Sequence, residues 1–195
     1  MNIAMLILAA GSSTRMGKPK QLLPYKNTTL LGWTIQNALK LNTHKIFCVL
    51  GANAMQIRSS IQNKKIEIIE NKEYLEGLSS SIVIGVTTIK NTNTDGVLIM
   101  LADQPKVSAV ILEKLTTTFK RNKNRIVAAN YGHKIGVPAI FPRSKFDLLL
   151  QLKGDKGAGD VIKNNAIPVA IKYEYLADID TVEHYETLLA TEKEK

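Results

Sequence analysis

Three basic residues lie in a short glycine-bounded loop that directly follows an apolar run near the amino terminus. The run spans residues 3–8, the glycines are Gly11 and Gly17, and the cations are Arg15, Lys18 and Lys20. Glycines let a ligand approach the backbone closely, N–H groups can face an anion, and the cations neutralise phosphate charge. The loop therefore points to a nucleoside triphosphate, and the plainer alternative is a strand-to-helix turn with surface cations.

Two familiar phosphate-binding loops do not fit this spacing. A Walker A loop has four residues between its glycines and a serine or threonine after the lysine. Here five residues separate Gly11 from Gly17, and Pro19 follows Lys18. The dinucleotide fingerprint G-x-G-x-x-G also fails, because only Gly11 and Gly17 are present.

An acidic residue ends the apolar run 97–102. Transfer of a nucleotidyl group depends mainly on positioning and charge stabilisation, and Mg²⁺ is normally held by one or two carboxylates beside substrate oxygens. Asp103 fits such a role, because Pro105 follows it and ends the strand. The alternative is that Asp103 only caps the helix expected near Ser108.

A second pair of acids, Asp178 and Asp180, follows the last expected strand. At i and i+2 of an extended segment both side chains point the same way, so both could reach one ion. Asp180 could also be the N-cap or N′ residue of the helix expected to start near Thr181.

The segment Gly77-Leu-Ser-Ser-Ser81 opens another expected helix. Serine hydroxyls and the free N–H groups of a helix start suit contacts to a base or ribose. A plain cap at Ser79 or Ser80 is the alternative.

Composition describes a globular chain of 195 residues, which is the size of one domain, 1–195. The apolar run at residues 3–10 is too short to span a bilayer and lacks a basic flank, so neither a membrane segment nor a signal peptide is expected. The lone Cys48 is expected in the core and cannot form an internal disulfide, which favours a cytoplasmic protein.

The net charge of +9 arises wholly in residues 1–66, which hold nine Lys and Arg and no acid. A polyphosphate ligand explains this bias better than nucleic acid, because only 6% of residues are aromatic.

Apolar runs alternate with amphipathic stretches, as in a three-layer α/β/α domain with a mostly parallel mixed sheet. We expect strands at 3–9, 45–50, 66–70, 96–101, 125–130, 139–141 and 167–172. We expect helices at 29–41, 54–62, 79–89, 108–120, 145–152, 159–164 and 181–191. In such a fold the site lies at the carboxyl ends of the strands. Trp33 falls on the buried face of the first helix and is expected to pack rather than to bind a ligand.

The loop also matches the longer pattern L-A-A-G-x-S-x-R-M-G-x-x-K, which resembles the MobA-like NTP transferases with their Rossmann-like nucleotidyltransferase fold. Further motifs follow in that family's order: Gly77-Leu-Ser-Ser-Ser-Ile82, Leu101-Ala-Asp-Gln-Pro105, Gly136-Val-Pro-Ala-Ile-Phe141, Gly154-Asp-Lys-Gly-Ala158 and Asp178-Ile-Asp-Thr181. The resemblance spans nearly the whole chain.

The resemblance implies roles for individual residues. It makes Arg15, Lys20 and Asp103 the catalytic residues, and Asp103 and Asp180 the ligands of Mg²⁺. The nucleotide would be bound by Leu8, Ala9, Ala10, Gly11, Arg15, Lys20, Gly77, Ser79 and Ser80. The Ala9-Ala10 form resembles the cytidylyl branch, which favours CTP.

Two departures concern the acceptor. Val137 stands where molybdopterin cytidylyltransferases often carry His, and Gly159 stands where Arg often follows G-D-x-G-A.

The leading hypothesis is transfer of CMP to a phosphorylated acceptor such as molybdopterin, with pyrophosphate release and a molybdoenzyme as a possible recipient of the product. The alternatives are a sugar phosphate or another alcohol phosphate as acceptor, or a non-catalytic cofactor-delivery protein.

Overall fold

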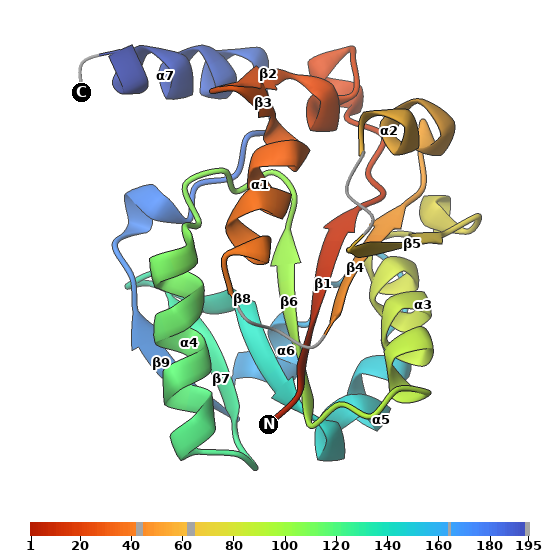
Figure 1. Cartoon of the computed structure of the whole chain (residues 1–195), viewed down its shortest axis with the longest axis vertical. Coiled ribbons are helices and arrows are strands. Elements are labelled where there is room, and N and C mark those ends of the chain that lie inside the picture. Colours follow the sequence, from red (N-terminus) through yellow and green to blue (C-terminus); the bar gives the residue numbers. More distant parts are fainter. Residues whose placement is uncertain (42–44, 62–64, 164, 194–195) are drawn as a thin grey trace.

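The computed structural model describes residues 1–41, 45–61, 65–163 and 165–193. Their main sheet has the strand order β5-β4-β1-β6-β8-β7-β9, and β8 runs antiparallel to both neighbours while the other pairs are parallel (Figure 1). The strands are β1 (Ile3–Ala9), β4 (Lys45–Leu50), β5 (Ile66–Glu70), β6 (Gly96–Leu101), β7 (Ile126–Asn130), β8 (Ile135–Pro142) and β9 (Ala166–Ala170). The mostly parallel mixed sheet is confirmed.

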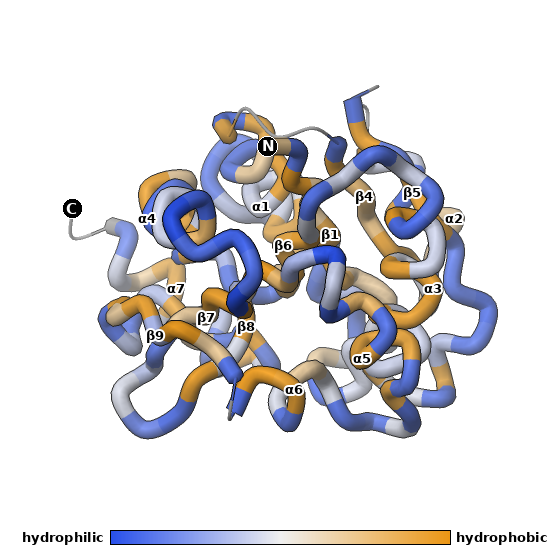
Figure 2. The backbone as a smooth tube through the Cα atoms, turned by 90° about the horizontal axis from the view of Figure 1, so that it is seen from below, coloured by the Kyte–Doolittle hydropathy of each residue, from blue (hydrophilic) through white to orange (hydrophobic). Residues whose placement is uncertain are grey.

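Helices cover both faces of this sheet, which confirms the three layers (Figure 2). One face packs against α1 (Leu30–Leu39), α2 (Ala54–Ser60) and α4 (Ala109–Arg121). The other face packs against α3 (Leu78–Lys90), α5 (Phe146–Leu150) and α6 (Gly159–Lys163).

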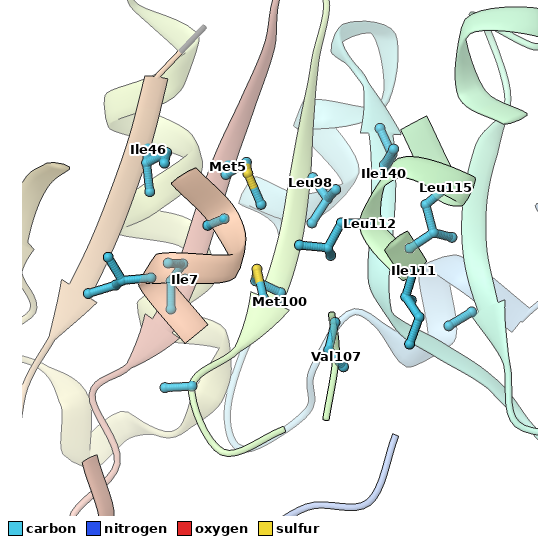
Figure 3. Packing of buried hydrophobic residues seen from close by; sticks show 14 of the residues in the cluster. Met5, Ile7, Ile46, Leu98, Met100, Val107, Ile111, Leu112, Leu115 and Ile140 are labelled. Carbon is cyan, nitrogen blue, oxygen red and sulfur yellow. The ribbon is translucent and has the colours of Figure 1, made fainter. Parts of the chain in front are cut away.

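The central strand β1 is buried on both faces, as an inner parallel strand must be. Met5 and Ile7 face the core under α1 and α4 (Figure 3), and Leu6 faces the core under α3. Gly85 of α3 allows a close approach, because a Cβ there would lie 2.6 Å from Leu6 Cδ1. This packing fixes the end of β1, from which the glycine loop departs.

A small third core lies above the carboxyl ends of β1 and β6. There α7 (Val182–Lys193) runs beside the hairpin of β2 (Pro24–Tyr25) and β3 (Thr28–Thr29), at the top of Figure 1. The buried residues that join these elements are Met16, Leu23, Tyr25, Leu30, Ile179 and Leu188. Trp33 packs against this core with its ring edge-on to Tyr25, which confirms its packing role.

Most expected elements are confirmed, with shifted ends. Strands β1, β4, β5 and β6 have the expected bounds, whereas β8 begins four residues before the expected 139–141, and the β2–β3 hairpin was not expected. Residues 62 and 164, the expected ends of two helices, lie outside the described residues, as does His44. Cys48 is fully buried, as expected.

Among the described residues, no helix combines the length and apolar character needed to cross a membrane.

Candidate active site

Lys20 contacts two aspartates, Asp103 and Asp180, that lie far apart in the sequence. Lys20 Nζ lies 2.5 Å from Asp103 Oδ2 and 2.8 Å from Asp180 Oδ1. Arg15 approaches the same group, with its guanidinium 3.3 Å from Asp180 Oδ2. The four charged residues predicted to act together are therefore in direct contact.

Each member of this cluster is held by a local feature of the fold. Asp103 follows β6, and Ser108 occupies the N-cap position of the next helix, so Asp103 does not serve as that cap. Thr181 Oγ1 accepts a hydrogen bond from the His184 N–H at the start of α7, so Thr181 is the N-cap and Asp180 stands at the N′ position, the second of the two positions expected for it. Both carboxylates are left to face Lys20.

Burial and charge act in opposite directions on this cluster. Burial by itself would lower the pKa of Lys20, but the charges and hydrogen bonds of Asp103 and Asp180 raise it above the ordinary 10.5. Burial would likewise raise the pKa of Asp180, but the hydrogen bond and charge of Lys20, with Arg15, lower it. Lys20 and Asp180 are therefore both charged at neutral pH.

A cavity of about 590 Å³ opens beside the cluster at the carboxyl ends of β1 and β6. Its volume is that of a small-molecule site. The predicted nucleotide-binding or catalytic residues that line it are Leu8, Ala9, Ala10, Gly11, Arg15, Lys20, Gly77 and Asp103. The exposed Lys18 does not line it.

A buried glutamine shapes the glycine loop at this cavity. Gln21 Nε2 donates hydrogen bonds to Ala9 O at 3.0 Å and Gly11 O at 2.9 Å, and Ser13 Oγ lies 3.3 Å from Gln21 Oε1. Ser13 and Gly17 both adopt left-handed backbone conformations, which arrange successive N–H groups as anion-binding concavities. The N–H groups of Met16 and Gly17 are bonded within the loop, so Gly11 and Ser12, which line the cavity, supply the backbone N–H groups suited to phosphate.

The start of α3 forms the opposite wall. Gly77 has φ +97, and a Cβ there would lie 2.6 Å from Asp155 Cα. The Leu78 N–H donates to Asp155 Oδ1 at 3.2 Å, and the Ser79 N–H and hydroxyl both donate to Gly154 O. The segment Gly154-Asp155 is thereby fixed against the helix, and Asp155 lines the cavity.

The serines of this helix do not point where the sequence suggested. Ser79 and Ser80 lie outside the first cavity and line a separate hollow beside α3, while Ser81 lines the first cavity. Gly77, not a serine, stands at the cap position. A helix places consecutive side chains about 100° apart, and the sequence alone did not fix the phase. Nucleotide contacts by Ser79 and Ser80 remain a prediction.

Ser81 is oriented by a neighbour that the sequence did not reveal. Asn71, which is 2% exposed, donates through Nδ2 to Ser81 Oγ at 3.0 Å. Because Asn71 supplies the donor to Ser81 Oγ, the Ser81 hydroxyl hydrogen can be donated to a ligand in the cavity.

A second buried glutamine organises the other side of the cluster. Gln104 Nε2 lies 2.8 Å from Asp178 Oδ1, 3.1 Å from Leu176 O and 3.2 Å from Tyr131 Oη. Asp178 thus turns to Gln104 while Asp180 turns to Lys20, so the two acids do not share one partner. Partial burial and the charge of Asp103 raise the pKa of Asp178.

The carboxylates present suit a divalent cation that substrate would help to hold. Asp103 Oδ1 is buried and has no hydrogen-bond partner among the described residues. Such an oxygen is a ready ligand, and Asp180 supplies another close by. No group of three or more His, Cys, Asp or Glu in the described part of the chain could hold a metal, so remaining ligands would come from phosphate and water.

Comparisons with known proteins agree with this geometry. Nicotine blue oxidoreductase of Paenarthrobacter nicotinovorans is 32% identical over 127 residues, which are 65% of this chain and 60% of that protein, so the match spans less than two thirds of the relative. The crystal structure of Rv0371c from Mycobacterium tuberculosis H37Rv is 28% identical with a TM-score of 0.85, covering 97% of this chain and 98% of that one. A manganese complex of Rv0371C is 27% identical with a TM-score of 0.80, covering 98% of this chain and 100% of that one.

A more distant structure shares the fold alone. Molybdopterin-guanine dinucleotide biosynthesis protein A from Archaeoglobus fulgidus is 13% identical with a TM-score of 0.76, covering 98% of this chain and all of that one.

The family model described as the MobA-like NTP transferase domain matches residues 5–169. On that match, joined to the glycine loop and the acids around Lys20, this chain belongs to the MobA-like NTP transferase family of nucleotidyltransferases.

Proposed function

We propose that this single-domain protein is a Mg²⁺-dependent nucleotidyltransferase that moves CMP from CTP to a phosphorylated acceptor, and that this acceptor is molybdopterin. The observation that carries the proposal is the contact of Lys20 with both Asp103 and Asp180 beside the glycine-loop cavity. That arrangement sets cations for a triphosphate next to carboxylates for a metal.

The reaction needs positioning and charge stabilisation more than covalent work by the protein. An acceptor phosphate oxygen attacks the α-phosphorus, a new P–O bond forms, and the bond to the β-phosphate oxygen breaks as pyrophosphate leaves. Arg15 can hold phosphate oxygens through two N–H groups, and Lys20 neutralises charge that develops on the leaving group. Mg²⁺ bound by Asp103 and Asp180 would polarise the reacting phosphate.

The far wall of the cavity favours cytosine over uracil. Asp155 can accept a hydrogen bond, and Ser81, which already accepts from Asn71, can donate one. The Leu78 N–H donates to Asp155 Oδ1, so the second carboxylate oxygen can accept from an exocyclic amino group. Cytosine offers such a group at N4, where uracil carries an acceptor.

The test is pyrophosphate release with Mg²⁺ and CTP, GTP, ATP or UTP, with and without molybdopterin. We expect release with CTP that depends on the acceptor. Asp103→Asn keeps the side-chain volume but removes a metal ligand, and we expect at least about a 100-fold loss, because even the partners of metal ligands matter tenfold to 100-fold.

Asp147→Asn is the matched control, because Asp147 pairs with Lys90 on an exposed surface of α5. Near-normal activity of Asp103→Asn would contradict the metal assignment. Release with a sugar phosphate in place of molybdopterin would keep the chemistry and change the acceptor. Tight binding of a cofactor without turnover would favour a delivery protein.

A further inference from the structure

A cavity of about 490 Å³ lies apart from the one beside the glycine loop. Its walls come from α1, the segment before α4, the turn of the β2–β3 hairpin and the end of α7 (Figure 1). Among the described residues, none lines both cavities. The chemistry proposed for the glycine-loop cavity therefore gives this second cavity no role.

A buried amide in this cavity lacks a partner. Asn37 of α1 is 3% exposed and lines the cavity, and its Nδ2 has no hydrogen-bond partner among the described residues. An unpaired buried donor costs free energy, and such a group in a folded protein calls for an explanation. An acceptor atom on a bound ligand would supply the missing partner.

The first turn of α4 borders the same cavity. Ser108 occupies the N-cap position and lines the cavity, but its side chain makes no capping hydrogen bond, and the first turn of α4 contains no acid. The first N–H groups of a helix have no partner within the helix, and the helix dipole places positive charge there. This end of the 13-residue α4 is therefore suited to an anion.

A lysine adds positive charge to these donors. Lys106 lines the cavity, and within the described part of the chain its Nζ makes one long contact, 3.4 Å to Thr191 Oγ1. The ammonium has three donors, so it can also bind a ligand oxygen. The amide of Asn37, the start of α4 and Lys106 thus supply donors for both oxygens of an anionic group.

Two acids limit the charge that a ligand can carry. Glu174 and Glu192 also line the cavity. Glu192 already accepts from Lys26 Nζ at 2.9 Å and from Tyr25 Oη at 3.1 Å. Because nearby carboxylates repel added negative charge, a carboxylate with one charge suits this cavity better than a phosphate dianion.

Aromatic rings form the rest of the wall. Tyr25, Trp33 and Tyr175 line the cavity. Tyr25 and Trp33 pack edge to face with their centroids 5.9 Å apart, so these two rings hold each other in place. Tyr175 is 36% exposed, which leaves part of its ring available to a ligand.

We propose that this cavity is a binding site for a small aromatic carboxylate, separate from the nucleotide site. Asn37, Lys106 and the first N–H groups of α4 bind the carboxylate, and Tyr175 packs against the ligand ring. The site goes beyond the proposed function and does not depend on nucleotidyl transfer.

The cavity contains its own reporter. Trp33 is the only tryptophan of the chain and lies in the cavity wall, so its fluorescence follows occupancy of the cavity. The probe is phenylacetate, titrated at constant ionic strength without nucleotide. We expect a saturable change with phenylacetate, and weaker binding of benzylamine, acetate and inorganic phosphate.

Two variants remove the expected donors. Asn37→Leu removes the amide at similar side-chain size, and Lys106→Met removes the charge but keeps the apolar stem. Each should weaken phenylacetate binding by about tenfold, the scale of one hydrogen bond to a charged group. Lys120→Met is the matched control, because Lys120 is exposed in the last turn of α4, and it should bind like the unmodified protein.

Two further measurements separate binding from folding and charge from ring. Urea unfolding should show Asn37→Leu to be at least as stable as the unmodified protein, because the substitution removes an unpaired donor. Tyr175→Leu should reduce the preference for phenylacetate over cyclohexylacetate.

Three results would overturn the proposal. The first is the absence of any saturable change in Trp33 fluorescence with phenylacetate. The second is binding that neither Asn37→Leu nor Lys106→Met weakens. The third is equal affinity for inorganic phosphate and phenylacetate, which would contradict a site for an aromatic carboxylate.

Discussion

Two buried glutamines, each directly after a charged residue of the site, hold its two sides in different ways. Gln21 follows Lys20 and binds backbone carbonyls of the glycine loop, and its Oε1 contacts Ser13. Gln104 follows Asp103 and binds Asp178, Tyr131 and a carbonyl, while its Oε1 has no partner among the described residues.

Main-chain atoms therefore shape one side of the site, whereas contacts between side chains shape the other side. On the nucleotide side, glycine conformations and main-chain atoms form the surface, and the ligand part they suit is a phosphate chain common to all NTPs. On the other side, the side chains of Gln104, Tyr131 and Asp178 make the contacts next to Asp103, and we propose that the acceptor binds on this side. Side chains change more readily than backbone geometry, so we expect acceptor choice to vary more than nucleotide chemistry between proteins with this fold.

The largest effect on the nucleotide side is expected from Gly77→Ala. Gly77 has φ +97 and ψ −177, a region open essentially to glycine alone, and an added Cβ would clash with the Asp155 backbone. The backbone conformation alone should lower the free energy of unfolding by about 1–3 kcal/mol. Urea unfolding measures this loss, and the KM for CTP should rise as the Asp155 segment moves.

Gly159→Ala is the matched control, because no atom lies within 4 Å of a Cβ there and its φ is not positive. Equal stability of the two variants would show that the α3 wall does not depend on Gly77.

The two glutamines can be compared directly by Gln21→Met and Gln104→Met. Gln21→Met leaves Ala9 O and Gly11 O without their donor, which should cost about 1–3 kcal/mol of stability. It should also raise the KM for CTP about tenfold as the loop loosens. Gln104→Met removes the donor to Asp178 and to Leu176 O, so we expect a loss of stability of similar size, but a raised KM for the acceptor rather than for CTP.

Thermal or urea unfolding and the two KM values form the measurement, with the exposed Gln56→Met as control. If Gln104→Met raised the KM for CTP more than for the acceptor, the division of the site into two sides would be wrong.

A smaller effect is expected from Asp178 and Asp180, which lie two residues apart but have pKa values shifted in opposite directions. The pKa of Asp180 is lowered, so its charge stabilises the fold above its ordinary pKa of 3.8, and this contribution is lost as the pH falls through the lowered value. The pKa of Asp178 is raised, so its charge costs stability at neutral pH, and protonation removes this cost as the pH falls toward 3.8.

Without added metal at pH 7, Asp180→Asn should therefore lower the free energy of unfolding, and Asp178→Asn should maintain or raise it. Asparagine at 178 can still accept from Gln104 through Oδ1. Both differences should shrink when unfolding is measured below pH 3.8. A loss of stability from Asp178→Asn at pH 7 would contradict the sign of its shift.

Much of the architecture was predictable because it depends on local patterns. Strands β1 and β6 are uninterrupted apolar runs, and their bounds were expected correctly. The two-residue strands β2 and β3 are too short to produce such a pattern. The first residues of β8 include Gly136, which interrupts the apolar pattern, so the sequence did not reveal where this strand begins.

The contacts of the site were less predictable, because they join distant positions. Lys20 and Asp103 lie 83 positions apart, and the sequence placed one with phosphate and the other with metal without indicating that they touch. Gln21 and Gln104 belong to no distinctive pattern of charge or spacing. Their roles depend on which carbonyls the folded chain brings to them.

The position of Lys20 also bears on how the chain matures. Carboxylates that converge without a counterion repel one another, and an uncompensated buried charge opposes folding. Lys20 is synthesised before both aspartates, and in the folded chain its side chain is only 15% exposed where it contacts them. The polypeptide thus carries its own counterion into the nascent site, and its maturation need not wait for the supply of metal or nucleotide.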